Sequence, residues 1–223
     1  MKLRINIIQI SCDGAAATGK STGAKMIAKK YKLKFLSSGL LYRYAGFLLI
    51  KYKPKNQINF LRKKFKNFDF KKISSIDLHS QQISQTTSII AKKYKVRKIL
   101  KTFQKNFAKK NKKCCIEGRD ISTEILPDSD IKFFFKCDLE TASKRRFKEL
   151  KKVNPKIKLK DIKKSLKIRN NRDISRKNSP LLKSRDAIIV DTSKLKNIPD
   201  MVNKMSEIIE RKVKYKYGSW NTN

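Results

Sequence analysis

A glycine-rich loop that ends in a lysine and a serine is the part of this sequence whose residue types and spacing best suit chemistry. Residues 14–21 have the sequence Gly-Ala-Ala-Ala-Thr-Gly-Lys-Ser, which fits the pattern G-x-x-x-x-G-K-[ST]. In such a loop, backbone N–H groups and the amino end of the next helix surround phosphate oxygens. Lys20 would reach the β- and γ-phosphates, and the Ser21 hydroxyl could bind Mg²⁺. The loop therefore predicts a site for a nucleoside triphosphate.

The residues on either side of the loop have the patterns that such a site needs. Ile5–Ser11 is rich in β-branched and apolar residues and predicts a buried strand. Ser21–Tyr31 predicts a helix, because alanine and isoleucine side chains would lie on one face and lysines on the other. A strand, a glycine-rich loop and a helix in this order favour phosphate binding over a structural turn.

Strand and helix patterns alternate along the rest of the chain. Five segments are predicted strands: Ile5–Ser11, Lys34–Leu36, Cys114–Glu117, Ile131–Lys136 and Ala187–Val190. Alternation of this kind indicates an α/β fold, in which helices flank a parallel five-stranded sheet. Right-handed crossovers place the carboxyl ends of such strands on one edge, where ligands bind. The phosphate loop follows the first strand and is therefore expected at that edge.

Two stretches interrupt the alternation. From Leu40 to about Lys113 the chain is too long for a simple crossover and has helical patterning, so we expect a small helical subdomain. Leu150–Leu159 contains Pro155 and several lysines between two predicted helices, and is expected to be a mobile flap. The polar, basic segment after Arg211 is expected to be a frayed tail.

The chain is strongly basic, with 57 lysine and arginine residues against 18 acidic residues and a formal charge of +39. This charge would suit a polyanionic partner. Lysines, however, occur in nearly every segment instead of forming one stripe, which indicates a chain-wide bias in composition. We expect weak, salt-sensitive adhesion to polyanions, without a specific nucleic-acid partner.

The cysteines, the single histidine and the lengths of the apolar runs bear on three possibilities: a metal site, a membrane span and secretion. The four cysteines form no C-x-x-C pair and the chain has a single histidine, so a metal site built from these residues is not expected. Reduced cysteines in core strands would fit the cytosol. No run of 18 apolar residues predicts a membrane span, and the first residues do not resemble a secretory signal. We therefore expect a cytoplasmic protein with no membrane partner.

Arginines gather at three further places. Glu117-Gly118-Arg119-Asp120 directly follows a predicted strand, and Arg145-Arg146 lies early in the helix before the flap. A third group, in one predicted helix, consists of Arg169, Arg172, Asp173 and Arg176. Its spacing of three to four residues would place it on one face. Most arginines of a basic chain are solvated, but arginine suits bidentate phosphate recognition better than lysine does. With the phosphate loop, these clusters predict phosphoryl transfer.

Taken together, these residues give the chain a resemblance to the bacterial cytidylate kinases, from Ile5 to about Met205. The segments that carry it are Asp13–Thr22, Ser38–Arg43, Val96–Leu100, Glu117–Thr123, Pro127–Asp130, Ala142–Leu150, Arg169–Arg176 and Pro180-Leu181. Their order and spacing are similar to those of the family. The resemblance implies a P-loop kinase that transfers the γ-phosphate of ATP to CMP or dCMP with Mg²⁺. It also implies a monomer that acts on small molecules.

The resemblance further implies three parts within one kinase unit of residues 1–223. A parallel-sheet core would comprise about residues 1–39, 114–147 and 177–212, and an enlarged helical subdomain for the monophosphate about 40–113. A short lid with its flanking helices would span about 148–176, followed by a flexible basic tail at 213–223.

The functional residues of the family are implied at matching positions of this sequence. ATP would bind Gly14, Ala15, Ala16, Ala17, Thr18, Gly19, Lys20, Ser21 and Thr22, and Ser21 would also hold Mg²⁺ with ATP phosphates and water. The acceptor phosphate would be held by Arg43, Arg119 and Arg176. The cytosine edge would be bound by Ser88, Arg97 and Asp120, and the sugar hydroxyls would be bound by Arg169 and Asp173. Ser38 would help to close the acceptor pocket. Arg145, Arg146 and Arg172 would serve the donor and the transferring group, so that the implied catalytic residues are Lys20, Arg119, Arg145, Arg146 and Arg172.

The sequence departs from the family pattern at several positions. Ala15 replaces a common proline, Ser37 a common aspartate and Ser122 a common glycine. The segment Asp77–Gln85 matches the family only loosely.

Two other functions are open at this point. A P-loop kinase could phosphorylate another small acceptor, such as UMP, shikimate or a coenzyme precursor, although the arginine clusters favour a nucleotide. The charge of +39 could instead mark an RNA-associated ATPase. Such a protein should show one positive face with aromatic stacking positions, and neither is clear in this sequence.

Overall fold

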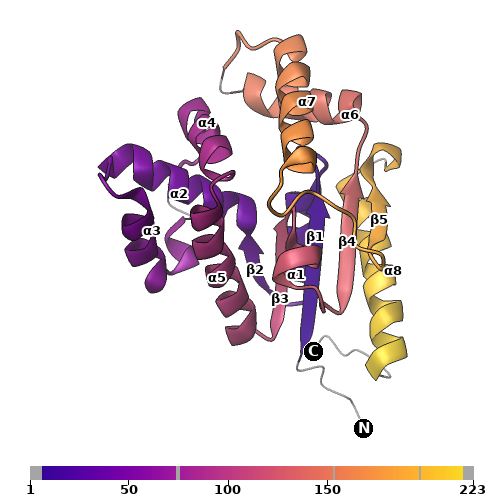
Figure 1. Ribbon diagram of the computed structural model, residues 1–223. Helices are drawn as coiled ribbons and strands as arrows, with labels where there is room; N and C mark the ends of the chain where they lie inside the picture. The colour runs from indigo at the N-terminus through magenta and orange to yellow at the C-terminus, as the bar shows by residue number, and fades with distance from the viewer. Residues whose placement is uncertain (1–6, 74–75, 153, 196, 218–223) are drawn as a thin grey trace. The chain divides into compact units, whose positions relative to one another are not determined.

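A five-stranded sheet organises the chain, and its strand order is β2-β3-β1-β4-β5 (Figure 1). The computed structural model describes residues 7–73, 76–152, 154–195 and 197–217. The strands are β1 (Ile8–Gly14), β2 (Lys34–Ser37), β3 (Lys113–Gly118), β4 (Ile131–Lys136) and β5 (Ile188–Asp191). The pairs β1–β3, β1–β4 and β4–β5 are parallel. The predicted α/β fold, with helices around a parallel five-stranded sheet, is confirmed.

The chain divides into two compact units, one of residues 1–35 and 112–223 and the other of residues 36–111. The helices of the first unit are α1 (Lys20–Lys30), α6 (Leu139–Lys151), α7 (Leu159–Ser175) and α8 (Ile198–Tyr217), with the short turns η2 (Ile121–Ile125) and η3 (Thr192–Lys194). The second unit contains α2 (Ser38–Tyr52), α3 (Gln57–Lys66), η1 (Phe70–Ile73), α4 (Gln81–Ile90) and α5 (Tyr94–Lys110).

Strand β1 begins and ends later than the sequence predicts. Residues 5 and 6 of the predicted strand Ile5–Ser11 lie outside the described residues, and the strand continues to Gly14. It does so because β1 pairs on both sides: Asp13 lies opposite Gly118 of β3, and Gly14 lies opposite Phe135 of β4. The first glycine of the phosphate loop is therefore part of the sheet.

Helix α8 covers part of the segment for which the sequence predicts a flexible tail. The helix runs to Tyr217, and the side chain of Val213 is only 2% exposed in the core. Val213 lies four residues after the buried Ile209, so the apolar face of the helix continues past Arg211. Residues 218–223 lie outside the described residues.

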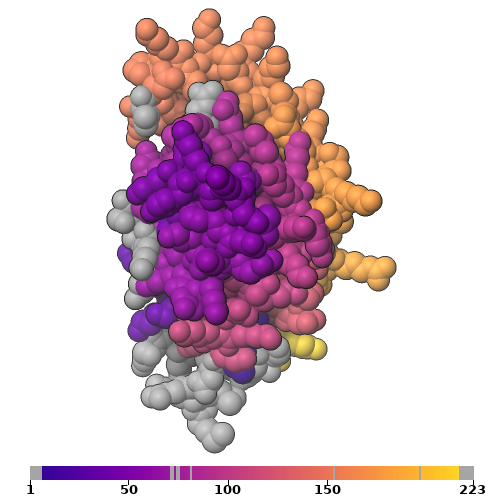
Figure 2. All heavy atoms as spheres, turned by 60° about the vertical axis from the view of Figure 1, so that its left-hand side comes forward, coloured from indigo at the N-terminus to yellow at the C-terminus, as the bar shows by residue number. Residues whose placement is uncertain are grey.

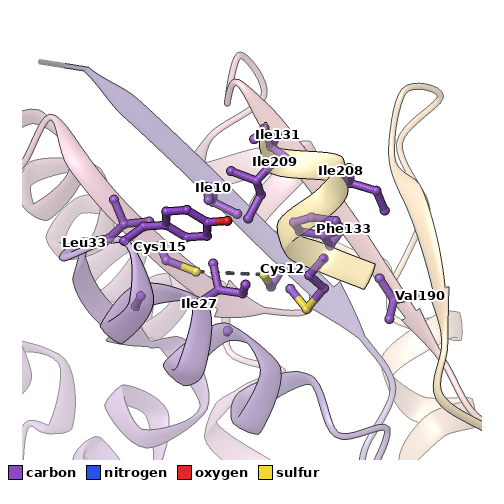
Figure 3. Close-up of a cluster of buried hydrophobic side chains, with 14 of the residues drawn as sticks. Ile10, Cys12, Ile27, Leu33, Cys115, Ile131, Phe133, Val190, Ile208 and Ile209 are labelled. Carbon is purple, nitrogen blue, oxygen red and sulfur yellow. Dashed lines mark hydrogen bonds between the residues drawn. The ribbon is translucent and has the colours of Figure 1, made fainter. Parts of the chain in front are cut away.

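The main apolar core of the first unit lies between the sheet and the helices α1 and α8 (Figure 3). Ile10 and Phe133 contribute from the strands, Ile27 from α1 and Ile209 from α8. Cys12 and Cys115 lie in the same core with their sulfur atoms 3.9 Å apart. Burial raises the pKa of the Cys12 thiol well above its ordinary value, so the thiol stays protonated and packs as a small apolar group.

A smaller apolar cluster joins the phosphate loop to the helical hairpin of α6 and α7. Ala16 of the loop packs with Ala142 of α6 and with Ile162 and Leu166 of α7. All four residues are buried. Because one turn of the loop is part of this cluster, the position of the hairpin helps to fix the shape of the loop.

The second unit is a helical bundle with an aromatic core, and Figure 2 shows the continuous surface of its side chains on one face. Leu41, Leu61 and Leu100 are fully buried at its centre. Around Phe65 the rings of Tyr44, Phe68 and Phe103 contact one another at centroid distances of 4.7 to 6.1 Å. Three helices begin at side chains that accept hydrogen bonds from their first turn, namely Ser37 for α2, Asn56 for α3 and Ser80 for α4.

Within the described ranges, no helix combines the length and apolar character needed to cross a membrane. The same part of the chain holds no group of three or more histidine, cysteine or acidic side chains that could bind a metal ion by itself.

Candidate active site

The phosphate loop has a backbone that depends on glycine at two positions. A Cβ atom at Gly14 would lie 2.6 Å from the carbonyl oxygen of Phe135, so only glycine allows β4 to approach this closely. Gly19 has φ of +77°, in the left-handed region. Ala17 also has a positive φ, of 59°, and the Thr18 hydroxyl donates to the carbonyl of Ala15 at 3.1 Å. The loop is therefore a tightly wound turn between β1 and α1.

Lys20, the first residue of α1, forms an ion pair with Glu117 of β3. The distance from Lys20 Nζ to Glu117 Oε2 is 2.5 Å, and the two side chains are 6% and 3% exposed. Burial lowers the pKa of Lys20, and the carboxylate of Glu117 opposes this effect. Glu117 belongs to the strand-end segment noted in the sequence, which assigns no role to it. Its position opposite Cys12, next to the loop, comes from the parallel register of β1 and β3.

Asp13 connects the start of the phosphate loop to the turn that carries Arg119 and Asp120. Its carboxylate accepts hydrogen bonds from the N–H groups of Ile121 and Ser122 at 2.8 and 2.7 Å, and from the Ser122 hydroxyl at 2.6 Å. Burial raises the pKa of Asp13, although these hydrogen bonds act to lower it. Ser122, which replaces a common glycine of the family, thus supplies two of the three donors, and its hydroxyl is the one that glycine would lack.

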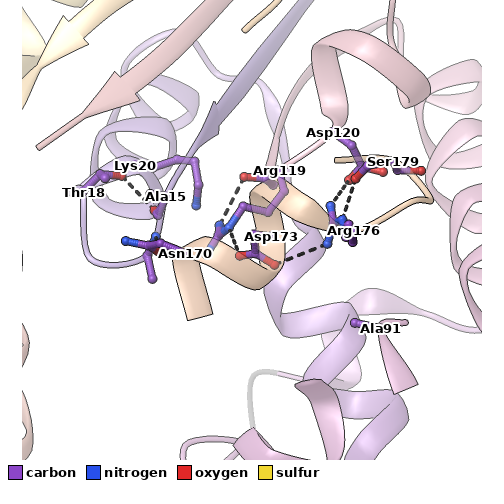
Figure 4. Close-up of polar contacts among 12 residues, drawn as sticks. Ala15, Thr18, Lys20, Ala91, Arg119, Asp120, Asn170, Asp173, Arg176 and Ser179 are labelled. Carbon is purple, nitrogen blue, oxygen red and sulfur yellow. Dashed lines mark hydrogen bonds and ion pairs between the residues drawn. The ribbon is translucent and has the colours of Figure 1, made fainter. Parts of the chain in front are cut away.

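Four predicted site residues form a chain of alternating charges in the first unit, and Figure 4 shows their side chains pointing toward one another. Arg119 Nε donates to Asp173 Oδ2 at 2.8 Å. Arg176, which directly follows α7, lies 3.4 Å from Asp173 Oδ1 through Nη1 and 3.9 Å from Asp120 Oδ1 through Nη2. Arg176 Nε also donates to the carbonyl of Ser179 at 2.6 Å. The structure therefore brings together the strand-end turn and the last turn of α7.

The carboxylate of Asp173 is held by the guanidinium groups around it. Burial acts to raise its pKa, but Arg119, Arg176 and Arg169 outweigh burial, and the net shift is downward. The side chain of Asp173 is 17% exposed, so solvent screens these interactions only in part. Asp173 therefore remains ionised between the arginines well below neutral pH.

Asn170 contacts the phosphate loop from α7. Its side-chain carbonyl, Oδ1, accepts a hydrogen bond from the N–H of Ala16 at 3.1 Å. The sequence places Asn170 between the two predicted arginines Arg169 and Arg172 but gives no signal for this contact. The bond adds a polar connection to the apolar cluster that α7 forms with Ala16.

Arg145 lies against the end of β5 instead of within the chain of charges. Its Nη1 donates to the Thr192 hydroxyl at 2.9 Å and its Nη2 to the Thr192 carbonyl at 2.8 Å. Thr192 Oγ1 in turn lies 2.9 Å from the carbonyl oxygen of Thr18 in the phosphate loop. Thr192 was not among the residues predicted from the sequence.

The remaining predicted residues of the first unit lie on α6, α7 and α1. Arg146 pairs with Glu149, three residues on in α6, at 2.8 Å. Arg169 and Arg172 are exposed on α7, and Ser21 and Thr22 are exposed in the first turn of α1.

The predicted residues of the second unit are oriented by contacts within that unit. Arg43 is buried in α2, and its Nη1 donates to the Leu78 carbonyl at 2.8 Å and to Ser84 Oγ at 3.0 Å. Arg97 donates to the Ala91 carbonyl at 3.3 Å, and its guanidinium lies 5.5 Å from the ring centre of Tyr42. Ser38 is buried at the start of α2, and Ser88 is half-buried in α4. Ser84 was missed in the sequence because its segment, Asp77–Gln85, lacks the expected pattern.

Removal of the Lys20 side chain should destabilise the protein, because it leaves the Glu117 carboxylate buried without its cation. For Lys20→Ala we expect the free energy of unfolding to fall by about 3 kcal/mol, the usual result of breaking a buried pair. Lys20→Ala combined with Glu117→Gln should recover most of this loss, because the remaining buried charge is removed as well. Urea unfolding of the three proteins measures both changes.

Binding of a fluorescent ATP analogue separates stability from ligand binding in the same variants. The double variant should be stable but should bind the analogue weakly, because the phosphate-binding ammonium is absent. A double variant no more stable than Lys20→Ala would contradict the assigned pairing.

Replacement of the Asp173 carboxylate should cost stability near neutral pH but not in acid. Its folded pKa is depressed, so its contribution is present above the unfolded pKa of about 3.9 and is lost as the pH falls through the folded value. For Asp173→Asn we expect a loss of about 2 kcal/mol near neutral pH, with a smaller difference from the original protein toward pH 3. Urea unfolding over this pH range measures the difference.

Asp186→Asn is the matched control for this series. Asp186 pairs with Lys132 at 2.8 Å, but its side chain is 62% exposed. A surface pair of this kind contributes about 0–1 kcal/mol. A loss at Asp173 no larger than the loss at Asp186, or one independent of pH, would contradict the role given to the arginines.

Comparison with known proteins places this geometry in a family. The cytidylate kinase family model matches residues 10–211. A cytidylate kinase of Bartonella tribocorum is 38% identical over 191 residues, which cover 83% of this chain and 87% of that protein. Cytidylate kinases of Mesomycoplasma hyopneumoniae (strain 7448) and Thermosipho africanus are 33% and 31% identical, and cover 92% and 93% of this chain and 95% and 97% of their own length.

A likeness to a solved structure concerns the fold alone. The shikimate kinase of Bacteroides thetaiotaomicron matches with a TM-score of 0.51 and 11% identity, covering 92% of this chain and 99% of that protein. Such low identity is compatible with many acceptors on one architecture. The family model and the relatives above cover most of the sequence, and the chain belongs to the cytidylate kinase family.

Proposed function

We propose that this protein is a phosphotransferase that moves the γ-phosphate of ATP to CMP, and to dCMP, in pyrimidine nucleotide metabolism. The observation that carries the proposal is the position of the phosphate loop in a member of the cytidylate kinase family. Within one unit, that loop is joined through Asp13 to the turn that bears Arg119 and Asp120. A donor-phosphate site and acceptor-type arginines are therefore connected by buried hydrogen bonds.

The donor side uses the phosphate loop and Lys20. Backbone N–H groups of the loop and the amino end of α1 attract the β- and γ-phosphates of ATP. Glu117 holds the Lys20 ammonium beside the loop, where the ammonium can contact phosphate oxygens. Arg145, Arg146 and Arg172 are proposed to neutralise charge on the donor and on the transferring group. Catalysis of phosphoryl transfer consists mostly of such positioning and neutralisation.

The acceptor side uses the chain of alternating charges. Arg119 and Arg176 are proposed to hold the phosphate of CMP, since two fixed guanidinium groups suit its oxygens. Asp173, with Arg169, is proposed to bind the sugar hydroxyls, and it already orients both phosphate-binding arginines. Asp120 is proposed to accept a hydrogen bond from the exocyclic amine of cytosine. Uracil presents a carbonyl there, and a carboxylate facing a carbonyl costs about 1–3 kcal/mol.

The second unit is proposed to complete acceptor recognition. Its Ser38, Arg43, Ser88 and Arg97 are proposed to bind the acceptor, and Arg43 and Arg97 each donate a hydrogen bond to a main-chain carbonyl. The assignment of residues 40–113 to monophosphate binding and of 148–176 to a lid is part of this proposal.

Mg²⁺ is the proposed cofactor, and the residues at the loop fit it. The Ser21 hydroxyl is exposed in the first turn of α1, and the described residues offer no metal site of three or more histidine, cysteine or acidic side chains. The remaining ligands of the ion would be oxygens of the ATP phosphates and of water, which Mg²⁺ prefers. Bound there, it would neutralise charge on the β- and γ-phosphates. A cytoplasmic monomer without a specific nucleic-acid partner is likewise part of the proposal.

A panel of acceptors tests the proposed reaction. In a coupled assay of ADP formation with ATP and Mg²⁺, we expect CMP and dCMP to be phosphorylated with a higher kcat/KM than UMP. About tenfold or more is expected, because one mismatched polar contact costs about 1–3 kcal/mol. Shikimate should give no turnover. Efficient turnover of UMP with none of CMP would overturn the assignment of the acceptor.

Asp120→Asn should impair the use of CMP far more than the use of ATP. The amide lacks the charge that accepts from the cytosine amine and pairs with Arg176, so kcat/KM for CMP should fall by roughly tenfold to a hundredfold. The KM for ATP should change by less than about twofold, since Asp120 is assigned to the acceptor side. Steady-state kinetics with each substrate varied in turn measures the two effects.

Asp128→Asn is the control, because Asp128 is an exposed acidic residue of the turn that follows the same strand-end segment. It should behave like the unmodified protein. Equal losses for CMP and ATP in Asp120→Asn would place Asp120 outside the acceptor site.

A further inference from the structure

Thr192 occupies a junction between three parts of the first unit. It directly follows β5, begins the short turn η3 and is only 2% exposed. Its neighbours are α6 through Arg145, the end of β4 through the Lys136 carbonyl and the phosphate loop through the Thr18 carbonyl. No role is assigned to it by the sequence motifs.

Arg145 holds Thr192 with both arms of its guanidinium. Nη1 donates to the side-chain oxygen at 2.9 Å and Nη2 to the main-chain oxygen of the same residue at 2.8 Å. A planar fork bound at two points loses most of its rotational freedom. The position of Arg145 is therefore set by Thr192, across a separation of 47 residues in the chain.

The hydroxyl of Thr192 also connects Arg145 to the phosphate loop through hydrogen bonds. Because it accepts from Arg145, its own hydrogen is available to an acceptor, and the nearer of its two carbonyl neighbours is Thr18 O at 2.9 Å against Lys136 O at 3.2 Å. The methyl group of Thr192 lies 3.9 Å from the point where a Cβ at Gly19 would be. One side chain thus fixes the residue before Gly19 and packs beside Gly19 itself.

We propose that Thr192 is a positioning residue of the ATP site, which holds the Arg145 guanidinium in register with the phosphate loop. The proposal rests on the donor role given to Arg145 under the proposed function. The chemistry is specific: a residue at this position must accept one hydrogen bond and donate another. Threonine and serine can do both, whereas valine, with nearly the shape of threonine, can do neither.

The test compares Thr192→Val and Thr192→Ser by equilibrium titration with mant-ATP, a fluorescent analogue of ATP. Thr192→Val should bind about tenfold more weakly, since it loses two buried hydrogen bonds of the loop and the arginine. Thr192→Ser should bind within about twofold of the unmodified protein, because its hydroxyl keeps both bonds. In steady-state kinetics the KM for ATP should rise in Thr192→Val while the KM for CMP stays within about twofold.

Ser193→Ala is the matched control. The neighbouring hydroxyl of Ser193 accepts from the N–H of Asp138 at 3.1 Å and donates to Asp191 at 2.6 Å, but these bonds involve neither Arg145 nor Thr18. Its removal should leave affinity for mant-ATP within about twofold, even if it lowers stability. A residue that acts only through stability would give the same result in Ser193→Ala and Thr192→Val at equal loss of thermal stability.

A double-mutant cycle identifies the route by which Thr192 acts. Thr192→Val should weaken mant-ATP binding much less in an Arg145→Ala background than in the unmodified protein, because the residue it positions is gone. If Thr192→Val does not fold, Thr192→Ala takes its place with the same expected result.

The outcomes separate this proposal from the proposed reaction. Binding of mant-ATP by Thr192→Val at the original affinity, lack of recovery in Thr192→Ser, or full additivity with Arg145→Ala would each overturn the role of Thr192. Absence of CMP phosphorylation by the unmodified protein would instead overturn the proposed reaction, and the mant-ATP titrations would still decide the role of Thr192.

Discussion

The buried ion pair of Lys20 and Glu117 is the interaction on which the rest of the site depends. An ammonium and a carboxylate that are 6% and 3% exposed are tolerated only because each neutralises the other. The pair exists because the parallel register of β1 and β3 places Cys12 opposite Glu117 and Asp13 opposite Gly118. The carboxyl end of β3 therefore places the carboxylate of Glu117 beside the lysine that begins α1. Glu117 of β3 thereby fixes the position of the lysine that ends the phosphate loop.

Acidic residues are few in this chain, and those that the structure describes as buried lie at the edge of the sheet beside the phosphate loop. The chain has 57 basic and 18 acidic residues, and the buried acidic residues of the described part of the chain are Asp13, Glu117 and Asp120. Asp13 accepts three hydrogen bonds, Glu117 pairs with Lys20, and Asp120 lies beside Arg176. Charge that would be costly in an apolar core is thus satisfied by donors that also shape the site. Lysines elsewhere pair with more exposed carboxylates, as Lys132 does with Asp186 and Lys163 with Glu140.

The phosphate loop is held by residues far outside its own motif. Its Ala16 N–H is bound by Asn170 of α7, 154 residues away, and its Thr18 carbonyl by Thr192, 174 residues away. Ala17 and Gly19 both have positive φ values, of 59° and 77°. A backbone in this region is costly for alanine, and it persists where surrounding contacts determine it. Asn170 and Thr192 supply such contacts on two sides of the loop. The shape of the loop therefore depends on the positions of the α6–α7 hairpin and of the residue that follows β5.

The sequence by itself determined the elements and the type of chemistry. Glycine spacing, the period of apolar residues and clustered arginines are local signals, and they identified the phosphate loop, the parallel α/β fold and the Arg119 and Arg176 clusters. Only the tertiary structure decided which distant side chains meet. Strand register brought Glu117 to Lys20 and Asp13 to Ser122, and packing of α7 and η3 brought Asn170 and Thr192 to the loop. Contacts of this kind depend on the register of strands and on side-chain directions in three dimensions. The spacing of residues along the chain determines neither of these.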